Sequence, residues 1–131
     1  MTQNLFVYGT LLPWATGELG AAQRARLSQE ATTLGPAVTL GVLFDLGSYP
    51  GMLVGDGAVH GAVYALTDPG FTLTWLDAYE GIAGTAYDDY RRVEQSVRLD
   101  DGRELPAHVY VYVLPVDPRR AIASGRWHLT P

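Results

Sequence analysis

The stretch at residues 90–114, YRRVEQSVRLDDGRELPAHVYVYVL, contains the clearest structural signal in the chain. Val93, Val97 and Leu99 recur with the period of two that places side chains on one face of a strand. Asp100-Asp101-Gly102 then supplies turn chemistry, and valine and tyrosine alternate in the residues that follow. This pattern predicts two antiparallel strands, over residues 90–99 and 105–114, joined by a tight turn.

The rest of the chain predicts further strands and two helices. Residues 18–30 have good helix propensity. A second helix is expected to begin at Asp68-Pro69, an N-cap followed by proline, and to stop at Gly81. Alternation and short apolar runs predict strands at residues 5–8, 37–45, 52–54 and 59–66. A turn is expected at residues 55–57, and the short connections favour a mostly antiparallel sheet or small barrel.

Length, composition and charge limit the class of protein. The chain has 131 residues, 47% of them hydrophobic and 18% charged, so we expect a single domain over residues 1–131 with one core. The net charge is −5, and the nine cations are arginines that come in pairs at most, which argues against nucleic acid as a partner. No apolar run approaches the ~20 residues needed to span a bilayer, and the first residues do not resemble a signal peptide. We therefore expect a cytoplasmic protein with no membrane partner.

Several kinds of catalytic site find no support in the residues. The chain has no cysteine, which excludes thiol catalysis and thiolate metal sites. No serine lies in a Gly-x-Ser-x-Gly turn of the kind that presents a hydrolase nucleophile. His60, His108 and His128 are far apart in the sequence, and none has a second histidine at the spacing of a metal pair. Each is better interpreted as a strand or tail residue than as a metal ligand.

The loop after the first expected strand is the first candidate site. Tyr8-Gly9-Thr10-Leu11 follows the apolar run at residues 5–7. A strand that ends in glycine can present successive backbone N–H groups outward and so form a small anion-binding concavity. Gly9 would let a ligand approach the main chain closely. An ordinary turn between a strand and a loop explains the same residues equally well.

The end of the second expected helix is the other candidate site. If the helix stops near Gly81, Glu80 lies in its last turn, where the helix dipole disfavours a carboxylate. Asp77 is three residues back on nearly the same face and adds like-charge repulsion. Both effects raise the pKa of a carboxyl group, which suits a proton shuttle at neutral pH. The alternative is a solvated surface glutamate beside a capping glycine.

Taken together, these residues resemble the γ-glutamylcyclotransferase-like family, which includes AIG2-like and YtfP-like proteins. The matching segments occur in family order and spread over nearly the whole chain. They are Phe6–Leu11, Leu46–Gly51, Val59–Tyr64, Leu76–Gly81, Tyr90–Val93, Val109–Tyr112 and Ser124–Trp127. The resemblance implies an α+β fold: a small mixed, mostly antiparallel β-barrel with two flanking helices.

The resemblance also implies an activity. In the family, the α-amine of a γ-glutamyl amide attacks its own γ-carbonyl, which releases an amine or amino acid and forms 5-oxoproline. Glu80 has the position of the family's general acid/base. The nucleophile belongs to the small-molecule substrate, so no metal and no cofactor is implied. The substrate-binding residues implied by the resemblance are Tyr8, Gly9, Thr10, Leu11 and Tyr112.

Several of these residues, and the function itself, have more than one interpretation from the sequence. Tyr110 and Tyr112 share a strand face, so core packing is an equally good interpretation of either residue. Asp88 and Asp89 either add a second carboxylate to the pocket or form a polar lead-in to the strand that follows. The chain could also be a binding module for glutamate-like carboxylates without catalysis, or an interaction domain with an exposed edge strand. A Glu80 that faces the Gly9–Leu11 loop across a pocket would exclude only the interaction domain. The sequence does not determine the oligomeric state.

Overall fold

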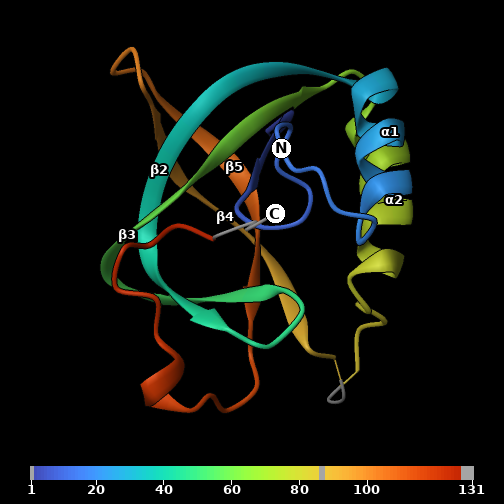
Figure 1. Ribbon diagram of the computed structural model, residues 1–131. Helices are drawn as coiled ribbons and strands as arrows, with labels where there is room; N and C mark the ends of the chain where they lie inside the picture. Colours follow the sequence, from blue (N-terminus) through green and yellow to red (C-terminus); the bar gives the residue numbers. More distant parts are fainter. Residues whose placement is uncertain (1, 86–87, 128–131) are drawn as a thin grey trace.

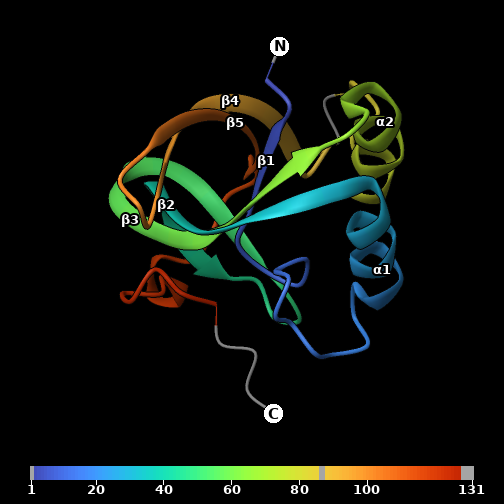
Figure 2. The same cartoon turned by 90° about the horizontal axis from the view of Figure 1, so that it is seen from above.

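Five strands close into a barrel in the order β1-β3-β2-β4-β5, which Figures 1 and 2 show from two directions. The computed structural model describes residues 2–85 and 88–127. The strands are β1 (Asn4–Val7), β2 (Ala31–Asp45), β3 (Pro50–Leu66), β4 (Tyr90–Leu99) and β5 (Glu104–Tyr112). The helices are α1 (Ala21–Glu30), α2 (Pro69–Tyr79) and a short 3-10 turn at Pro118–Arg120. The expected α+β barrel with two flanking helices is confirmed.

Strand pairing is mostly antiparallel. Strand β3 pairs with β1 on one side and with β2 on the other, and β2 and β5 each pair with β4. The barrel closes where β1 meets β5 in parallel, through the registered pair Leu5 and His108. Only this last pairing is parallel among the described strands, so the sheet is mixed as expected.

The turn expected at residues 55–57 is wrong, because β3 runs without interruption from Pro50 to Leu66. Its glycines lie where the two long strands come close together. A Cβ atom on Gly57 would lie 2.8 Å from the carbonyl oxygen of Gly41, and one on Gly55 would lie 2.6 Å from a methyl group of Val42. Here glycine permits close approach within a sheet rather than a reversal of the chain.

The start of β2 also differs from the expectation. The strand begins at Ala31 rather than at residue 37, so it continues α1 without a connecting loop. Its pairing with β3 is irregular between Thr33 and Gly35 and again between Leu40 and Val42. The first irregularity interrupts the alternation of side chains before residue 37, which explains why periodicity detected only the second half of the strand.

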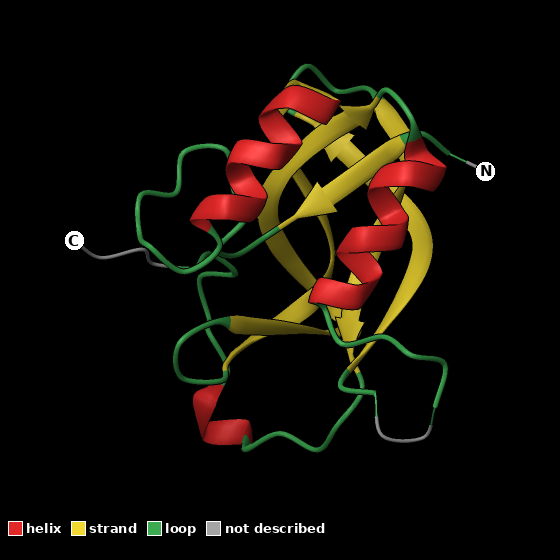
Figure 3. Ribbon diagram, turned by 90° about the vertical axis from the view of Figure 1, so that its right-hand side faces the viewer, coloured by secondary structure: helices red, strands yellow, loops and turns green. Residues whose placement is uncertain are grey.

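Both helices cover the same side of the barrel, side by side (Figure 3). Helix α2 begins as expected: the Asp68 carboxylate accepts a hydrogen bond from the Phe71 N–H at 3.2 Å, and Pro69 is the first helical residue. Helix α1 begins three residues later than expected, after Gly20 with φ +79°. No described helix is long and apolar enough to cross a membrane.

The core has two parts. One part lies between the helices and the barrel and includes Leu27, Leu73 and Leu76 from the helices. The other part fills the barrel around Phe6 and is covered by the C-terminal segment, including Ile122 and Trp127. The loop after β1 and the end of α2 both lie at the border of the first part, because Leu11 and Ile82 pack into it.

Candidate active site

A cavity of about 330 Å³ lies between the loop that follows β1 and the C-terminal end of α2. Its volume is in the range of small-molecule binding sites. The cavity is lined by Phe6, Val7, Tyr8, Gly9, Thr10, Leu11, Leu19, Tyr49, Pro50, Tyr79, Glu80, Gly81, Asp89, Tyr90 and Tyr110. Both candidate sites from the sequence therefore line one concave pocket, an arrangement that favours a small-molecule site over the interaction-domain interpretation.

The loop that follows β1 requires glycine at position 9, where it lines the cavity. A Cβ atom on Gly9 would lie 2.7 Å from the ring of Pro50, so no larger residue fits there without movement. The loop then turns through a hydrogen bond from the Leu12 N–H to the Gly9 carbonyl at 3.0 Å. This close approach of the main chain to β3 brings the loop to the mouth of the barrel.

The polar groups of this loop are divided between structure and cavity. Arg24 of α1 donates a hydrogen bond to the Thr10 carbonyl at 2.6 Å, and the Tyr64 hydroxyl donates one to the Leu11 carbonyl at 3.0 Å. In the described part of the chain, no group accepts a hydrogen bond from the N–H of Gly9, Thr10 or Leu11. Three neighbouring donors therefore remain available beside the cavity, as an anion site requires.

The other side of the cavity is formed by the cap of α2. Gly81 has φ +77°, and its N–H donates to the Ala78 carbonyl at 3.1 Å, while the Ile82 N–H donates to the Asp77 carbonyl at 2.9 Å. These two bonds form the paired closure typical of a helix that ends in glycine, and Ile82 packs on the core. The cap fixes Glu80 as the last residue before the glycine, at the cavity wall.

Glu80 has the electrostatic environment of a proton-transfer group. Its side chain is half-buried, and burial raises the pKa of its carboxyl group from 4.5 to about 7, with a smaller contribution from the negative charge of Asp77. A carboxyl group with this pKa exchanges protons readily at neutral pH. The structure thus brings Glu80 to the same cavity as Gly9, Thr10 and Leu11.

The tyrosines of the site divide into structural and cavity-facing groups. Tyr8 lines the cavity, but its hydroxyl is buried, where it donates to the Tyr110 carbonyl at 2.7 Å and accepts from the Met52 N–H at 3.2 Å. Tyr112 lies outside the lining residues and contacts Tyr90 edge-on, with ring centroids 5.3 Å apart. Its substrate-binding role stays a prediction.

Tyr90 and Tyr110 line the cavity, although the sequence did not single out either as a site residue. Alternation had placed Tyr110 and Tyr112 on one strand face, and it could not distinguish which of the two reaches the pocket. The Tyr90 hydroxyl donates to the Pro50 carbonyl at 3.1 Å, and the Tyr110 hydroxyl donates to Asp77 at 2.6 Å.

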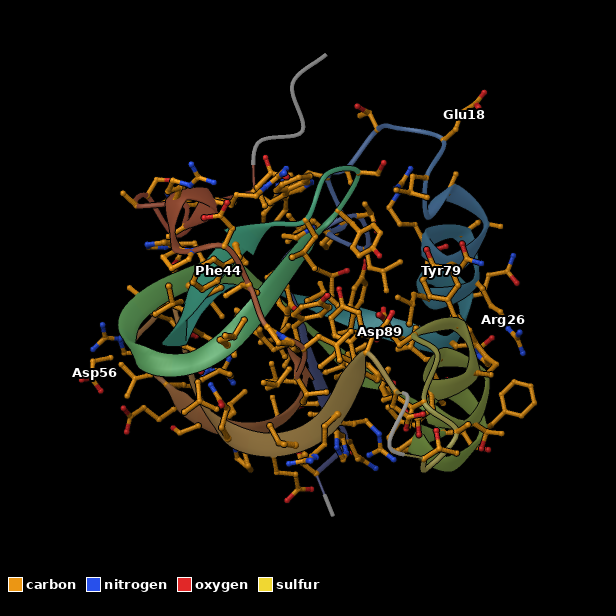
Figure 4. All side chains as sticks on the ribbon, turned by 90° about the horizontal axis from the view of Figure 1, so that it is seen from below. Glu18, Arg26, Phe44, Asp56, Tyr79 and Asp89 are labelled. Atoms are coloured by element: carbon orange, nitrogen blue, oxygen red, sulfur yellow. The ribbon has the colours of Figure 1, made fainter. Side chains whose placement is uncertain are left out.

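The two neighbouring aspartates have different environments. Asp88 accepts hydrogen bonds from the N–H groups of Ala83 and Gly84, which lower the pKa of its carboxyl group. Asp89 lines the cavity and is its second carboxylate. Figure 4 shows Tyr79 and Asp89 where α2 faces the barrel, and Asp56 at the opposite edge of the molecule.

The described residues contain no group of three histidine, aspartate or glutamate side chains that could hold a metal ion. His60 and His108 both lie on strands, as expected. The Nδ1 atom of His108 lies 3.0 Å from an arginine, which cannot accept a hydrogen bond, so that nitrogen is an acceptor. His128 lies outside the described residues.

Comparisons with known proteins agree on one family. The family model described as gamma-glutamyl cyclotransferase, AIG2-like, matches residues 5–129. The chain is 40% identical to the gamma-glutamylcyclotransferase family protein YtfP of Escherichia coli over 85 residues, 65% of this chain and 66% of that protein. It is 32% identical over 130 residues to a Vibrio cholerae protein named "Putative gamma-glutamylcyclotransferase", covering 97% of this chain and 96% of that protein. The solution structure of Escherichia coli YtfP superposes with a TM-score of 0.64 at 34% identity, covering 95% of each chain.

Proposed function

Because the chain belongs to the AIG2-like gamma-glutamyl cyclotransferase family, we propose that it converts γ-glutamyl amides into 5-oxoproline and a free amine or amino acid. Glu80 is the general acid/base in this proposal. The Gly9–Leu11 loop binds the substrate through its backbone N–H groups. Neither a metal nor a cofactor is required, since the attacking amine and the leaving amine both belong to the substrate.

The reaction begins with the substrate folded in the cavity. The chain between its α-amine and γ-carbonyl must bend into the shape of a five-membered ring. A site that binds the substrate in this conformer lowers the entropic barrier to ring closure, because the loss of conformational freedom occurs on binding rather than in the reaction step. The apolar walls formed by Phe6, Val7 and Leu11 enclose the carbon chain. The free N–H groups of the loop bind the substrate carboxylate or the oxyanion that develops on the γ-carbonyl.

Glu80 moves two protons, one after the other, from the attacking nitrogen to the leaving nitrogen. In its ionised form it accepts a proton from the α-ammonium group, and the free amine then attacks the γ-carbon. A tetrahedral intermediate forms with its negative charge on the former carbonyl oxygen. The intermediate also carries a positive charge on the former α-nitrogen, and it collapses as the protonated Glu80 donates to the leaving nitrogen, which breaks the old amide bond. The restored carboxylate then takes the second proton from the former α-nitrogen and passes it to the released amine. No water is consumed, and the enzyme ends in its starting state.

One observation carries the proposal: a half-buried carboxyl group with a pKa of about 7 lies in the same cavity as three backbone N–H groups without described acceptors. The first group suits proton transfer at neutral pH, and the second suits a developing oxyanion. Either group alone has ordinary structural explanations. Their combination in one cavity of small-molecule size is what the proposed reaction needs.

The test measures 5-oxoproline release from glutathione, γ-glutamyl-alanine and γ-glutamyl-ε-lysine. The wild type should release 5-oxoproline from at least one of them, and Glu80→Gln should lower kcat by at least about 100-fold because glutamine cannot carry a proton. Glu104→Gln is the matched control, since Glu104 is exposed on β5 and does not line the cavity. This variant should keep wild-type turnover.

Two results would contradict the proposal in different ways. Wild-type turnover by Glu80→Gln would remove the acid/base role but leave the reaction in place. Saturable binding of the three compounds without any product would show that the cavity is a binding module for glutamate-like carboxylates.

A further inference from the structure

Asp77 lies one turn before Glu80 on α2 and is held by side chains from two strands of the barrel. Arg92 of β4 donates from Nε to one carboxylate oxygen at 2.9 Å and from Nη2 to the other at 3.2 Å. The Tyr110 hydroxyl of β5 donates to the first oxygen at 2.6 Å. The Arg92 and Asp77 side chains are 27% and 24% exposed. A two-point ion pair at this depth restrains both partners more than a surface pair does.

Arg92 is itself oriented from its other side. Its Nη1 donates to Nδ1 of His108 at 3.0 Å, and the opposite ring nitrogen of His108 donates to the Thr2 carbonyl at 3.1 Å. Burial lowers the pKa of His108, and the charge of Arg92 lowers it further, so the imidazole is neutral at neutral pH. The guanidinium group is therefore fixed between β5 and the end of α2.

Asp77 also forms part of the cap that follows Glu80. Its backbone carbonyl accepts the hydrogen bond from the Ile82 N–H at 2.9 Å, which closes the chain around Gly81. The side chain of Asp77 thus binds α2 to the barrel through Arg92 and Tyr110. Its main-chain carbonyl binds the cap residue Ile82 to the helix. Glu80 lies between these two attachments, and Tyr110, which holds Asp77, lines the same cavity as Glu80.

We propose that Asp77 is a positioning residue: Arg92 and Tyr110 hold it against the barrel, and it fixes the carboxyl group of Glu80 relative to the Gly9–Leu11 loop. The inference rests on the proposed function, because the position of Glu80 matters for the reaction described above. Asp77 does not line the cavity, so its effect on turnover passes through Glu80.

The same arrangement affects the titration of Glu80. The carboxylate of Asp77 repels a negative charge on Glu80. Arg92 is the ion-pair partner of that carboxylate. The other titratable groups that interact with Glu80 or share its cavity are Asp89 and the hydroxyls of Tyr8, Tyr79, Tyr90 and Tyr110. Burial raises the pKa values of these tyrosines, so they stay protonated over the range in which Glu80 titrates. Changes at Asp77 or Arg92 should therefore be visible in that titration.

The experiment compares Asp77→Asn and Arg92→Gln with the wild type by two readouts. Carbon-13 NMR of the Glu80 carboxyl group reports its pKa without any turnover, and 5-oxoproline release gives kcat and KM. Asp77→Asn should lower the pKa of Glu80 by roughly one unit, and Arg92→Gln should raise it. Both should reduce kcat by about 10- to 100-fold through misplacement of the carboxyl group, with KM changed by less than about threefold.

Arg91→Gln is the matched control. Arg91 is exposed on the same strand, one residue before Arg92, and it forms no ion pair with a described residue. The substitution removes the same charge and should leave both readouts at wild-type values. Should either test variant fail to fold, Tyr110→Phe replaces it, because it removes only the hydroxyl that donates to Asp77. That variant should still lower kcat by severalfold.

The outcomes separate this inference from the proposed function. An unchanged Glu80 titration in Asp77→Asn and Arg92→Gln, or an equal loss of kcat in Arg91→Gln, overturns the positioning role. A Tyr110→Phe variant that keeps wild-type kcat overturns it as well. A wild type that releases no 5-oxoproline overturns the proposed function, while the Glu80 titration still tests the link to Asp77.

Discussion

The two helices lie on the same side of the barrel but are held there in different ways. Helix α2 has a side-chain cap at its start and a glycine cap at its end, and it buries Thr72, Leu73 and Leu76. Helix α1 begins at Ala21, after Gly20 and without a side-chain cap, passes directly into β2 and buries only Leu27. The helix that carries Glu80 is thus fixed at both ends, whereas its neighbour depends on one buried leucine and on polar contacts. Precise placement is concentrated in the element that carries the candidate acid/base.

The largest expected effect comes from removing the single buried anchor of α1. Leu27 is fully buried, so Leu27→Ala should lower the free energy of unfolding by about 3 kcal/mol through lost burial and a residual cavity. Hydrogen exchange should accelerate mainly in α1, because nothing else in that helix is buried, while α2 should keep its protection. Denaturant unfolding and amide exchange measure the two parts. An equal acceleration of hydrogen exchange in α1 and α2 would contradict the conclusion that α1 is held to the barrel less firmly than α2.

A second prediction concerns the pH dependence of stability at the end of α2. Because the folded-state pKa of Glu80 is raised to about 7, the folded protein binds more protons than the unfolded chain between about pH 4.5 and pH 7. The free energy of unfolding should therefore fall as the pH rises through this window. Glu80→Gln cannot ionise, so it should gain about 3 kcal/mol relative to the wild type between pH 4 and pH 8. Denaturant unfolding at the two pH values measures this, and a constant difference would contradict it.

Gly81→Ala should cost less in stability but should also affect turnover. With φ +77° and no atom near an added Cβ, the cost is purely that of the backbone conformation, about 1 kcal/mol. Gly84→Ala is the matched control, because Gly84 has φ +80° and equally open surroundings. Both variants should lose similar stability in thermal unfolding. Only Gly81→Ala should lower kcat, since only Gly81 belongs to the cap that fixes Glu80; equal kcat values would count against that role.

The smallest expected effect lies between the helices. Arg26 of α1 stacks over the ring of Trp75, 4.4 Å from its centroid, and pairs with Glu30 at 2.7 Å. Arg26→Met should lower the free energy of unfolding by about 0.5 kcal/mol, since these contacts are partly exposed. Arg103→Met, which breaks the exposed pair with Asp101, should cost less in the same denaturant titration. A larger loss of unfolding free energy in Arg103→Met than in Arg26→Met would show that the contact between the helices contributes no more than an exposed ion pair.

Local chemistry made several parts of the fold predictable. Asp68, Pro69 and Gly81 act through contacts within one turn of the chain, so the bounds of α2 follow from the sequence. The hairpin of β4 and β5 follows from alternation and the turn at Asp100–Gly102 for the same reason. The turn predicted at Gly55 and Gly57 is wrong, because the same residue type occurs both in turns and at close approaches between strands. Only the partner strand distinguishes the two.

The parts of the candidate site that depend on one short segment were also predictable, whereas its contacts between distant segments were not. Gly9 and Glu80 each lie in a short segment whose local properties already suggested chemistry, and the structure brings these two segments to one cavity. The contacts of Asp77 with Arg92 and Tyr110 join residues 15 and 33 positions apart in the chain. Such contacts depend on how α2 packs against β4 and β5, and periodicity within one segment carries no information about that packing.

The closure of the barrel has a consequence for heat resistance. Strand β1 meets β5 through one registered pair, and the cavity lies across this seam, with Tyr8 on one side and Tyr110 on the other. A seam with so few ladder bonds opens at lower temperature than the long β2–β3 pairing. Opening it separates the Gly9–Leu11 loop from Tyr110, whose hydroxyl donates to Asp77 near the end of α2. We therefore expect turnover to be lost at a lower temperature than the one at which the barrel unfolds. The loss of turnover on heating would then measure the separation of β1 from β5 rather than global unfolding.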